Sequence, residues 1–262
     1  MLAGDRAVAS ARRAELKRAE QAWEDELAAA AGPAAGEGDG TQAAARPPEP
    51  PDSLLPLREQ VYEALSLLQV PAAPKLIATV HEAFFGSTFP TTRVTSLKRD
   101  EERSFRTAPF ARPYYICAAL SADYLSPSRG LLAVSTWPMD RRVIGSLSPR
   151  VDFLTAAIRV ADAIERIPTP PLTARRLLQR FAASIPGAGP VSGMTLASAS
   201  PDQVKPDVVR QAADAELSVH ADADSRMRRE AADRARGQLA DAEQLFGTRL
   251  APVTDEAGTG AG

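Results

Sequence analysis

The chain has 262 residues, of which 44% are hydrophobic and 24% are charged, so it can bury a sizeable core. Its formal net charge of -2 excludes a uniformly basic coat for nucleic acid, although a near-neutral total can hide a local basic face. Cys117 is the sole cysteine, which excludes an internal disulfide and a cysteine-rich zinc site. No segment reaches the roughly 20 apolar residues of a membrane span, so we expect a cytoplasmic protein with no membrane partner.

The chain opens with a predicted solvated helix over residues 1–31. Ala, Glu, Lys and Arg dominate residues 8–30, which contain neither Gly nor Pro. Residues 32–52 then combine Gly, Pro, Ala and acidic residues without apolar periodicity, which predicts a disordered linker.

The predicted main domain spans residues 53–168 and begins with two helices joined by a short turn. Apolar residues recur at helical spacing over 57–69 and again over 74–85, and prolines separate the two segments. Gly86 follows the second segment and tolerates the left-handed conformation with which helices often end. A sharp change of direction after the second helix is therefore expected.

A third helix is predicted over residues 91–106, with one packed side and one cationic side. At about 100° per residue, Val94, Leu97 and Phe105 fall on the packed side. The opposite side carries hydroxyl and guanidinium groups, from Thr92, Ser96, Arg99, Arg103 and Arg106. This face is the candidate binding surface of the domain.

The charges of the third helix admit two interpretations. Residues 75–142 contain ten Lys and Arg against six Asp and Glu, a local surplus of four positive charges that favours a polyanionic partner. The acidic residues in the same helix favour instead a solvated face with i, i+4 pairs, such as Glu102 with Arg106. Both interpretations place the Arg side chains in solvent.

A two-stranded hairpin and a fourth helix complete the predicted domain. Aromatic, β-branched and apolar runs predict strands over 112–120 and 131–137, joined by a loop over 121–130. A helix over 150–167 follows and has a broad apolar surface, which makes it the predicted dimerisation element. The residues of that surface are Phe153, Leu154, Ile158, Val160 and Ile164.

Beyond the domain, composition predicts a short helix over 169–186, a linker over 187–205, a long helix over 206–247 and a disordered tail over 248–262. The apolar stripe of the long helix is mostly alanine, which is too thin for a tight autonomous coiled coil. We expect this helix to pack on a partner protomer or another protein. Its basic residues are expected in exposed pairs with neighbouring acids, and they are Arg226, Arg228, Arg229, Arg234 and Arg236.

Enzymatic motifs are incomplete in this sequence. His81 begins the sequence HEAFF, in which Phe85 replaces the second His that a zinc protease motif needs. The Gly-rich stretches lack the spacing that cradles nucleotide phosphates. Cys117 lies in an apolar strand, which favours a buried structural thiol over a nucleophile. We therefore predict no enzymatic activity, no cofactor and no metal.

The order of these elements, together with the sequence GSTFPTTRVTSLKRDEERSFR, resembles the winged helix-turn-helix family. The resemblance implies an α+β fold whose core has three helices and a two-stranded wing, here with additional helices and flexible N- and C-terminal extensions. It also implies that helix 91–106 enters the major groove of double-stranded DNA while the wing lies against the backbone. The implied DNA contacts are Thr92, Arg93, Ser96, Arg99, Arg103, Arg106 and, at the wing tip, Arg129.

Two functions from different classes follow. The first is a DNA-binding transcriptional regulator, expected as a homodimer because one short helix reads few bases, and nucleoid-associated when bound. The second is a scaffold or adaptor that uses the winged-helix domain and the terminal helices for protein contacts. Exposed Arg side chains on helix 91–106 favour the first function, and exposed apolar anchors would favour the second.

Overall fold

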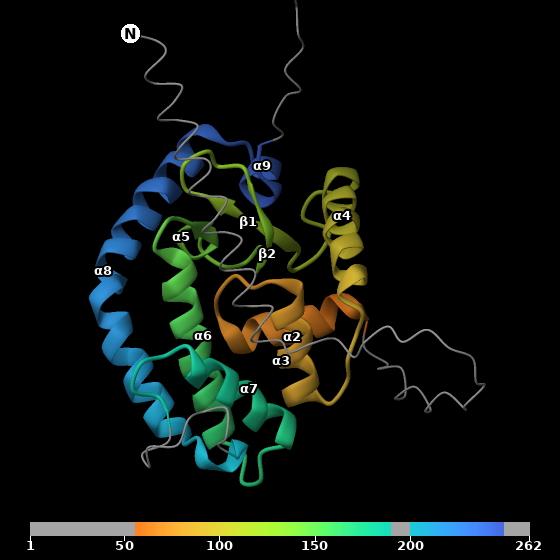
Figure 1. Ribbon diagram of the computed structural model, residues 1–262. Helices are drawn as coiled ribbons and strands as arrows, with labels where there is room; N and C mark the ends of the chain where they lie inside the picture. The colour runs from red at the N-terminus through yellow and green to blue at the C-terminus, as the bar shows by residue number, and fades with distance from the viewer. Residues whose placement is uncertain (1–55, 190–199, 249–262) are drawn as a thin grey trace, which may run out of the picture.

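The structure is a computed structural model of the chain, and it describes residues 56–189 and 200–248. The fold is α+β and mostly helical, with a small three-stranded mixed sheet (Figure 1). The predicted N-terminal helix over 1–31, the linker over 32–52 and the tail from residue 249 onward lie outside the described residues. Within the described part, no helix is long and apolar enough to cross a membrane.

Three helices begin the described chain close to their predicted bounds: α2 (Leu57–Leu68), α3 (Pro74–Phe85) and α4 (Thr91–Thr107). Helix α2 ends at Gln69, whose backbone is left-handed with φ 61°, and whose N–H bonds to the carbonyl of the preceding turn. Helix α3 ends at Gly86 with φ 78°, where the lack of a Cβ removes the steric cost. The sequence signal for the end of α3 at Gly86 is confirmed, whereas the left-handed Gln69 at the end of α2 was not predicted.

The turn between α3 and α4 is fixed by a buried histidine. His81 donates from Nδ1 to the carbonyl oxygen of Ser87 at 2.7 Å, across the end of α3. Its ring also packs on Phe85 and on the buried Phe89, with centroids 5.1 and 5.5 Å apart. These contacts hold the chain in place as it enters α4.

The predicted hairpin is present, with shifted ends and a third strand beside it. Strands β1 (Ile116–Ser121) and β2 (Pro127–Val134) are antiparallel, and β3 (Val143–Ile144) runs parallel to β1 on its other edge. A short helix, α5 (Met139–Arg142), joins β2 to β3. Neither α5 nor β3 was predicted, because elements of four and two residues are too short to show a periodicity.

Helices α6 (Ser148–Glu165) and α7 (Leu172–Ala183) follow the sheet, near the segments predicted as helices over 150–167 and 169–186. Part of the predicted linker over 187–205, residues 190–199, lies outside the described residues. Its last residues contain a short 3₁₀ turn and the buried side chain of Val204.

The long helix predicted over 206–247 is divided in two. Helix α8 (Pro206–Gln238) ends before Leu239 and Ala240, whose backbone angles are extended, and α9 (Asp241–Phe246) then begins in a new direction. The break lets Phe246 reach the sheet, where it is buried with Phe105 and Tyr115. Alanine-rich periodicity continues through this point, so the sequence alone did not reveal the break.

The main hydrophobic core extends beyond residue 168. It joins the first helices and one face of the sheet to later elements, as shown by Leu65 of α2, Ile116 of β1, Phe181 of α7 and Val209 of α8. Burial of apolar side chains contributes about 1.5–3 kcal/mol each, so α7 and the start of α8 add to the stability of the same core.

The apolar surface that was predicted for dimerisation is used within the chain. Leu154, Val160 and Ile164 of α6 are buried in the main core, and α8 lies along α6 over much of its length (Figure 1). The long helix docks on its own chain through α8, and the expectation that it also docks on a partner stays a prediction. A side chain already buried against its own protomer offers no surface to another.

A buried polar cluster, made of Ser148, Asp152, Asp224 and Arg228, locks α8 to α6. Arg228 donates to Asp152 at 2.7 Å and to Asp224 at 2.6 Å, while the hydroxyl of Ser148 donates to Asp224 at 2.6 Å. Burial raises the pKa of Asp152 to about 7, although the Arg228 guanidinium opposes this shift. The prediction that Arg228 is exposed was wrong, because this position of α8 faces α6.

Candidate nucleic-acid interface

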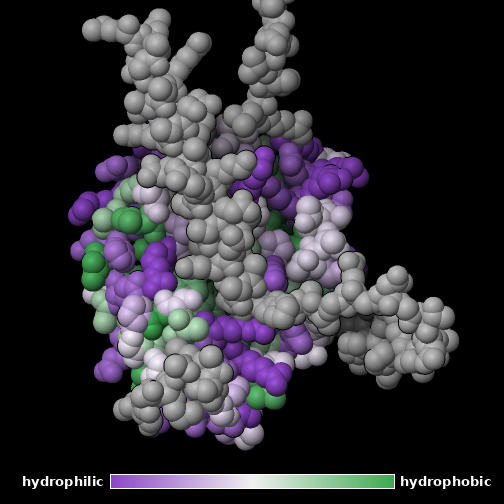
Figure 2. All heavy atoms as spheres, viewed as in Figure 1, coloured by the Kyte–Doolittle hydropathy of each residue, from purple (hydrophilic) through white to green (hydrophobic). Residues whose placement is uncertain are grey.

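Helix α4 has one buried face and one outer face that is exposed to solvent. Val94, Glu101 and Phe105 are buried, whereas all of the predicted contact residues of this helix are exposed. Those exposed residues are Thr92, Arg93, Ser96, Arg99, Arg103 and Arg106. The surface at the upper end of α4 is strongly hydrophilic (Figure 2). The helical period thus assigned both faces correctly.

A buried carboxylate fastens α4 to the start of the sheet. Glu101 is 2% exposed and accepts the backbone N–H of Ile116 at 3.0 Å. Its other oxygen accepts from Arg112 at 2.6 Å, so the buried charge is paired and hydrogen-bonded. Phe105, one turn later, packs edge-on against Tyr115 with ring centroids 5.2 Å apart. These contacts fix the direction in which the outer face of α4 points.

The Arg side chains of the outer face differ in what they bind. Arg106 is held by Glu102, because its Nε and Nη2 atoms lie 3.0 and 2.9 Å from one carboxylate oxygen, as the i, i+4 spacing predicted. By contrast, Arg93, Arg99 and Arg103 form no side-chain hydrogen bond or ion pair with another residue that the structure describes. Three guanidinium groups on this helix therefore retain their donors for a partner.

Arg129 is exposed as predicted, and it lies on β2 rather than on α4. The helix is anchored at Ile116, which pairs with Val134 at the base of the hairpin, whereas Arg129 lies toward the tip. The two positions on β2 are five residues apart (134 minus 129), which is at most roughly 17 Å of strand. The six predicted contacts of α4 thus share one helix, whereas Arg129 belongs to the hairpin.

The tip of the hairpin is covered by the C-terminal helices. Ala122 and Leu125 are buried in a cluster with alanines of α8, and Arg234 donates to the carbonyl oxygen of Ala122 at 2.8 Å. The N–H of Thr248 reaches the carbonyl oxygen of Leu125 at 3.4 Å. Tyr124 remains 70% exposed at the tip. Helix α8, and Thr248 after α9, thus hold most of the loop.

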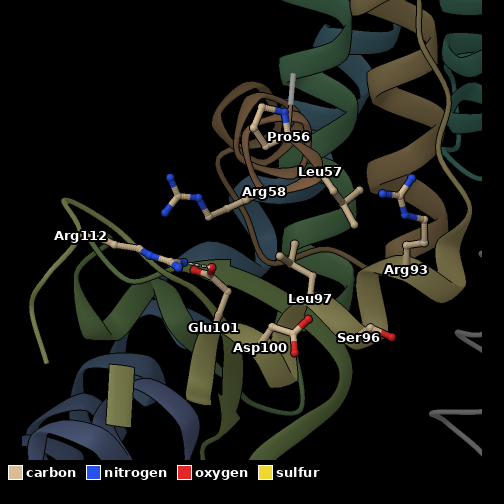
Figure 3. Close-up of a pocket in the computed structure, with 9 residues that line it drawn as sticks. All are labelled: Pro56, Leu57, Arg58, Arg93, Ser96, Leu97, Asp100, Glu101 and Arg112. Carbon is tan, nitrogen blue, oxygen red and sulfur yellow. Dashed lines mark hydrogen bonds and ion pairs between the residues drawn. The ribbon is translucent and has the colours of Figure 1, made fainter. Parts of the chain in front are cut away.

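A cavity of about 590 Å³ lies between the first turn of α2 and the outer face of α4 (Figure 3). It is lined by Pro56, Leu57 and Arg58 of α2, by Arg93, Ser96, Leu97, Asp100 and Glu101 of α4, and by Arg112. In Figure 3, Arg58 and Arg112 lie at one end of the cavity and Arg93 lies at the other, with Leu57 and Leu97 between them. Two of the predicted contact residues, Arg93 and Ser96, thus face this cavity.

Sequence reasoning missed Arg58 and Arg112 as members of a site. Arg58 is the second residue of α2, and Arg112 lies in the irregular segment that follows α4. Arg58 donates to Glu59 at 2.8 Å and lies over the ring of Tyr114, 4.9 Å from its centroid. The hydrogen bond from Tyr114 lowers the pKa of Glu59. No local pattern links positions 54 residues apart, so only the tertiary structure shows that these two cations line the same cavity.

The described residues hold no metal-ligand cluster, and Cys117 is their only cysteine. Within residues 56–189 and 200–248, no group of three or more His, Cys, Asp or Glu side chains is placed to hold a metal ion. Cys117 is fully buried, and burial raises the pKa of its thiol even though Arg142 lies 3.9 Å away. A neutral buried thiol packs as a small apolar group in the sheet.

Comparison with known proteins gives no further guide to this site. No protein-family model matches the chain, and no curated protein or solved structure matches it.

Proposed function

We propose that this protein binds double-stranded DNA with the outer face of α4 in the major groove, as a transcriptional regulator. The observation that carries the proposal is the set of unpaired, exposed guanidinium groups of Arg93, Arg99 and Arg103 on a helix whose other face is fixed in the core. Arg reaches the O6 and N7 atoms of guanine with two parallel hydrogen bonds, which contribute about 1–3 kcal/mol of discrimination. Thr92 and Ser96 add hydroxyl groups that can bind bases or phosphates.

The order of elements supports a winged-helix architecture for this region. Helices α2, α3 and α4 precede the β1–β2 hairpin, and Ala72, between α2 and α3, pairs with Leu132 of β2. Their N–H and C=O groups exchange two hydrogen bonds of 3.0 Å each. This bridge ties the connection between the first two helices to the hairpin and leaves α4 on the outside.

The covered hairpin tip changes what the wing contributes to the proposed complex. With Ala122 and Leu125 buried against α8, base contacts are assigned to α4, and the hairpin supplies at most Arg129 and Tyr124. We therefore expect few minor-groove contacts. A second copy, if one binds beside the first on DNA, must attach through a surface other than the buried faces of α6 and α8.

The alternative function is a scaffold or adaptor, and the surface of α4 argues against it. Among the described residues, no large hydrophobic side chain of α4 is exposed. Phe110, which is 69% exposed, follows the helix and packs edge-on against Phe105. One exposed ring at the end of α4 provides a weaker anchor than the clustered aromatic residues of protein interfaces.

The proposal is tested by titrating random-sequence duplex DNA at several salt concentrations, with the double variant Arg99→Ala, Arg103→Ala beside the wild type. Wild-type binding should weaken steeply with salt, and the double variant should bind far more weakly. The matched control is Arg226→Ala, Arg229→Ala, which removes the same charge from exposed positions of α8. Equal affinity of the double variant and the control would overturn the placement of α4, and no wild-type binding at low salt would favour the scaffold.

A further inference from the structure

The cavity between α2 and α4 gathers cations from three separate segments. Arg58 comes from the first turn of α2, Arg93 from the first turn of α4, and Arg112 from the segment after α4. Because Arg93 and Ser96 also belong to the outer face of α4, the cavity is continuous with the proposed DNA interface (Figure 3). A partner that lies on the outer face of α4 would pass over its opening.

Arg58 has a donor that its protein neighbours do not use. Its Nη2 atom donates to Glu59 at 2.8 Å, but its Nη1 atom is buried and has no hydrogen-bond partner in the described structure. A buried donor without a partner costs roughly 1–3 kcal/mol, which is recovered if the Arg58 side chain shifts so that Nη1 meets an acceptor in the cavity. The contact with the ring of Tyr114, 4.9 Å away, holds the guanidinium group in place.

The charges around the cavity decide where an anion would bind. Glu101 is already neutralised by Arg112, which keeps further N–H donors on its half-exposed guanidinium group. Asp100 carries the remaining negative charge in the lining and is exposed. Both guanidinium groups at this end are already paired, Arg58 with Glu59 and Arg112 with Glu101, so an anion there binds through their remaining N–H donors, which match the oxygens of a phosphate.

We propose that this end of the cavity binds a backbone phosphate of the DNA duplex, so that the interface extends from α4 onto the first turn of α2. The inference rests on the proposed DNA binding by α4. Its specific content is that Arg58, outside the helix that enters the groove, contributes one phosphate contact. Such a contact positions the protein on DNA and carries no base specificity.

The test measures how the dissociation constant for one duplex depends on salt, for the wild type, Arg58→Gln and Arg58→Lys. Each phosphate contact contributes about 0.9 to the slope of log K against log salt, so Arg58→Gln should lower the slope by about one and weaken binding equally for all duplex sequences. Arg58→Lys keeps the positive charge and should show the same slope as the wild type. The matched control is Arg229→Gln on α8, which should leave the slope unchanged. Thermal unfolding of each variant shows that it is folded.

The outcomes separate this inference from the function on which it rests. If the wild type binds DNA and Arg58→Gln leaves the slope unchanged, the phosphate contact is wrong and the placement of α4 stands. If inorganic phosphate raises the melting temperature of the wild type but not of Arg58→Gln, and the DNA slopes are equal, the cavity takes a free anion and the proposal is likewise overturned. If the wild type binds no DNA, both proposals fall together.

Discussion

Helices α4 and α8 both carry several Arg residues among acids, yet the structure uses these residues in opposite ways. On α4, Arg99 and Arg103 are exposed and pair with no other described residue. On α8, Arg228 is buried between Asp152 and Asp224 and holds that helix against α6. Similar sequences thus give an exposed cationic face in one region and a structural clamp in the other, because neighbouring elements cover one helix face and leave the other in solvent.

Removing an exposed Arg and removing a buried Arg should cost the protein different properties. An exposed guanidinium group is hydrated in the free protein, so its removal should change the affinity for a partner more than the stability of the fold. A buried one leaves two carboxylates without their counter-charge, and this cost falls on the folded state. The two regions should therefore separate in stability and affinity measurements.

The largest expected effect tests the clamp. Arg228→Ala should lower the free energy of unfolding by about 3–5 kcal/mol, because Asp152 and Asp224 remain buried without their partner. Urea unfolding followed by circular dichroism measures this change. Arg229→Ala, at the exposed neighbouring position, is the control and should change the same quantity by less than about 0.5 kcal/mol. Similar losses in the two variants would show that Arg228 is not a clamp.

The titration of Asp152 gives the next effect. Its pKa of about 7 in the folded state lies above its ordinary value of 3.8, so the folded state holds the proton to higher pH. This group therefore reduces stability as the pH rises from about 4 to 7. Asp152→Asn carries no titrating proton, so its unfolding free energy relative to the wild type should increase by about 3 kcal/mol over that window. Parallel stability curves for the two proteins would rule out the raised pKa.

Removing the exposed pair on α4 should lower the affinity for DNA and leave the free energy of unfolding almost unchanged. Arg99→Ala with Arg103→Ala should weaken DNA binding by roughly 2–3 kcal/mol, or about 30- to 150-fold, through lost contacts in the groove. Its unfolding free energy should stay within about 0.5 kcal/mol per substitution of the wild type. Fluorescence anisotropy and urea unfolding on the same samples measure both quantities. A marked loss of stability without a loss of affinity would break the contrast with α8.

The smallest effect concerns Arg106, which is exposed but already paired with Glu102. Arg106→Ala should change the free energy of unfolding by about 0.3–0.5 kcal/mol at most, as for other i, i+4 pairs in solvent. Because Arg106 is already paired with Glu102, fewer of its N–H donors are free for DNA. Its removal should therefore weaken DNA binding less than removal of Arg99 alone. Anisotropy titrations of the two single variants rank them, and the opposite order would contradict this assignment.

The sequence by itself determined four of the helices and the two faces of α4. Apolar spacing placed α2, α3, α4 and α6 within about two residues of their ends, and the turn of 100° per residue put Arg99 and Arg103 in solvent. The left-handed end of α3 followed from Gly86, because the preference of glycine for that conformation is local. In each case, the information lies within one or two turns of chain.

Only the tertiary structure decided which remote segments meet. The pairing of Arg228 with Asp152 joins residues 76 positions apart, and the cavity of Arg58 and Arg112 joins the start of α2 to the segment after α4. The two-residue strand β3 and the cover over the hairpin tip likewise depend on neighbours that are distant in sequence. Burial, and with it the role of a charged residue, is set by such long-range packing, which leaves no periodic trace in the local sequence.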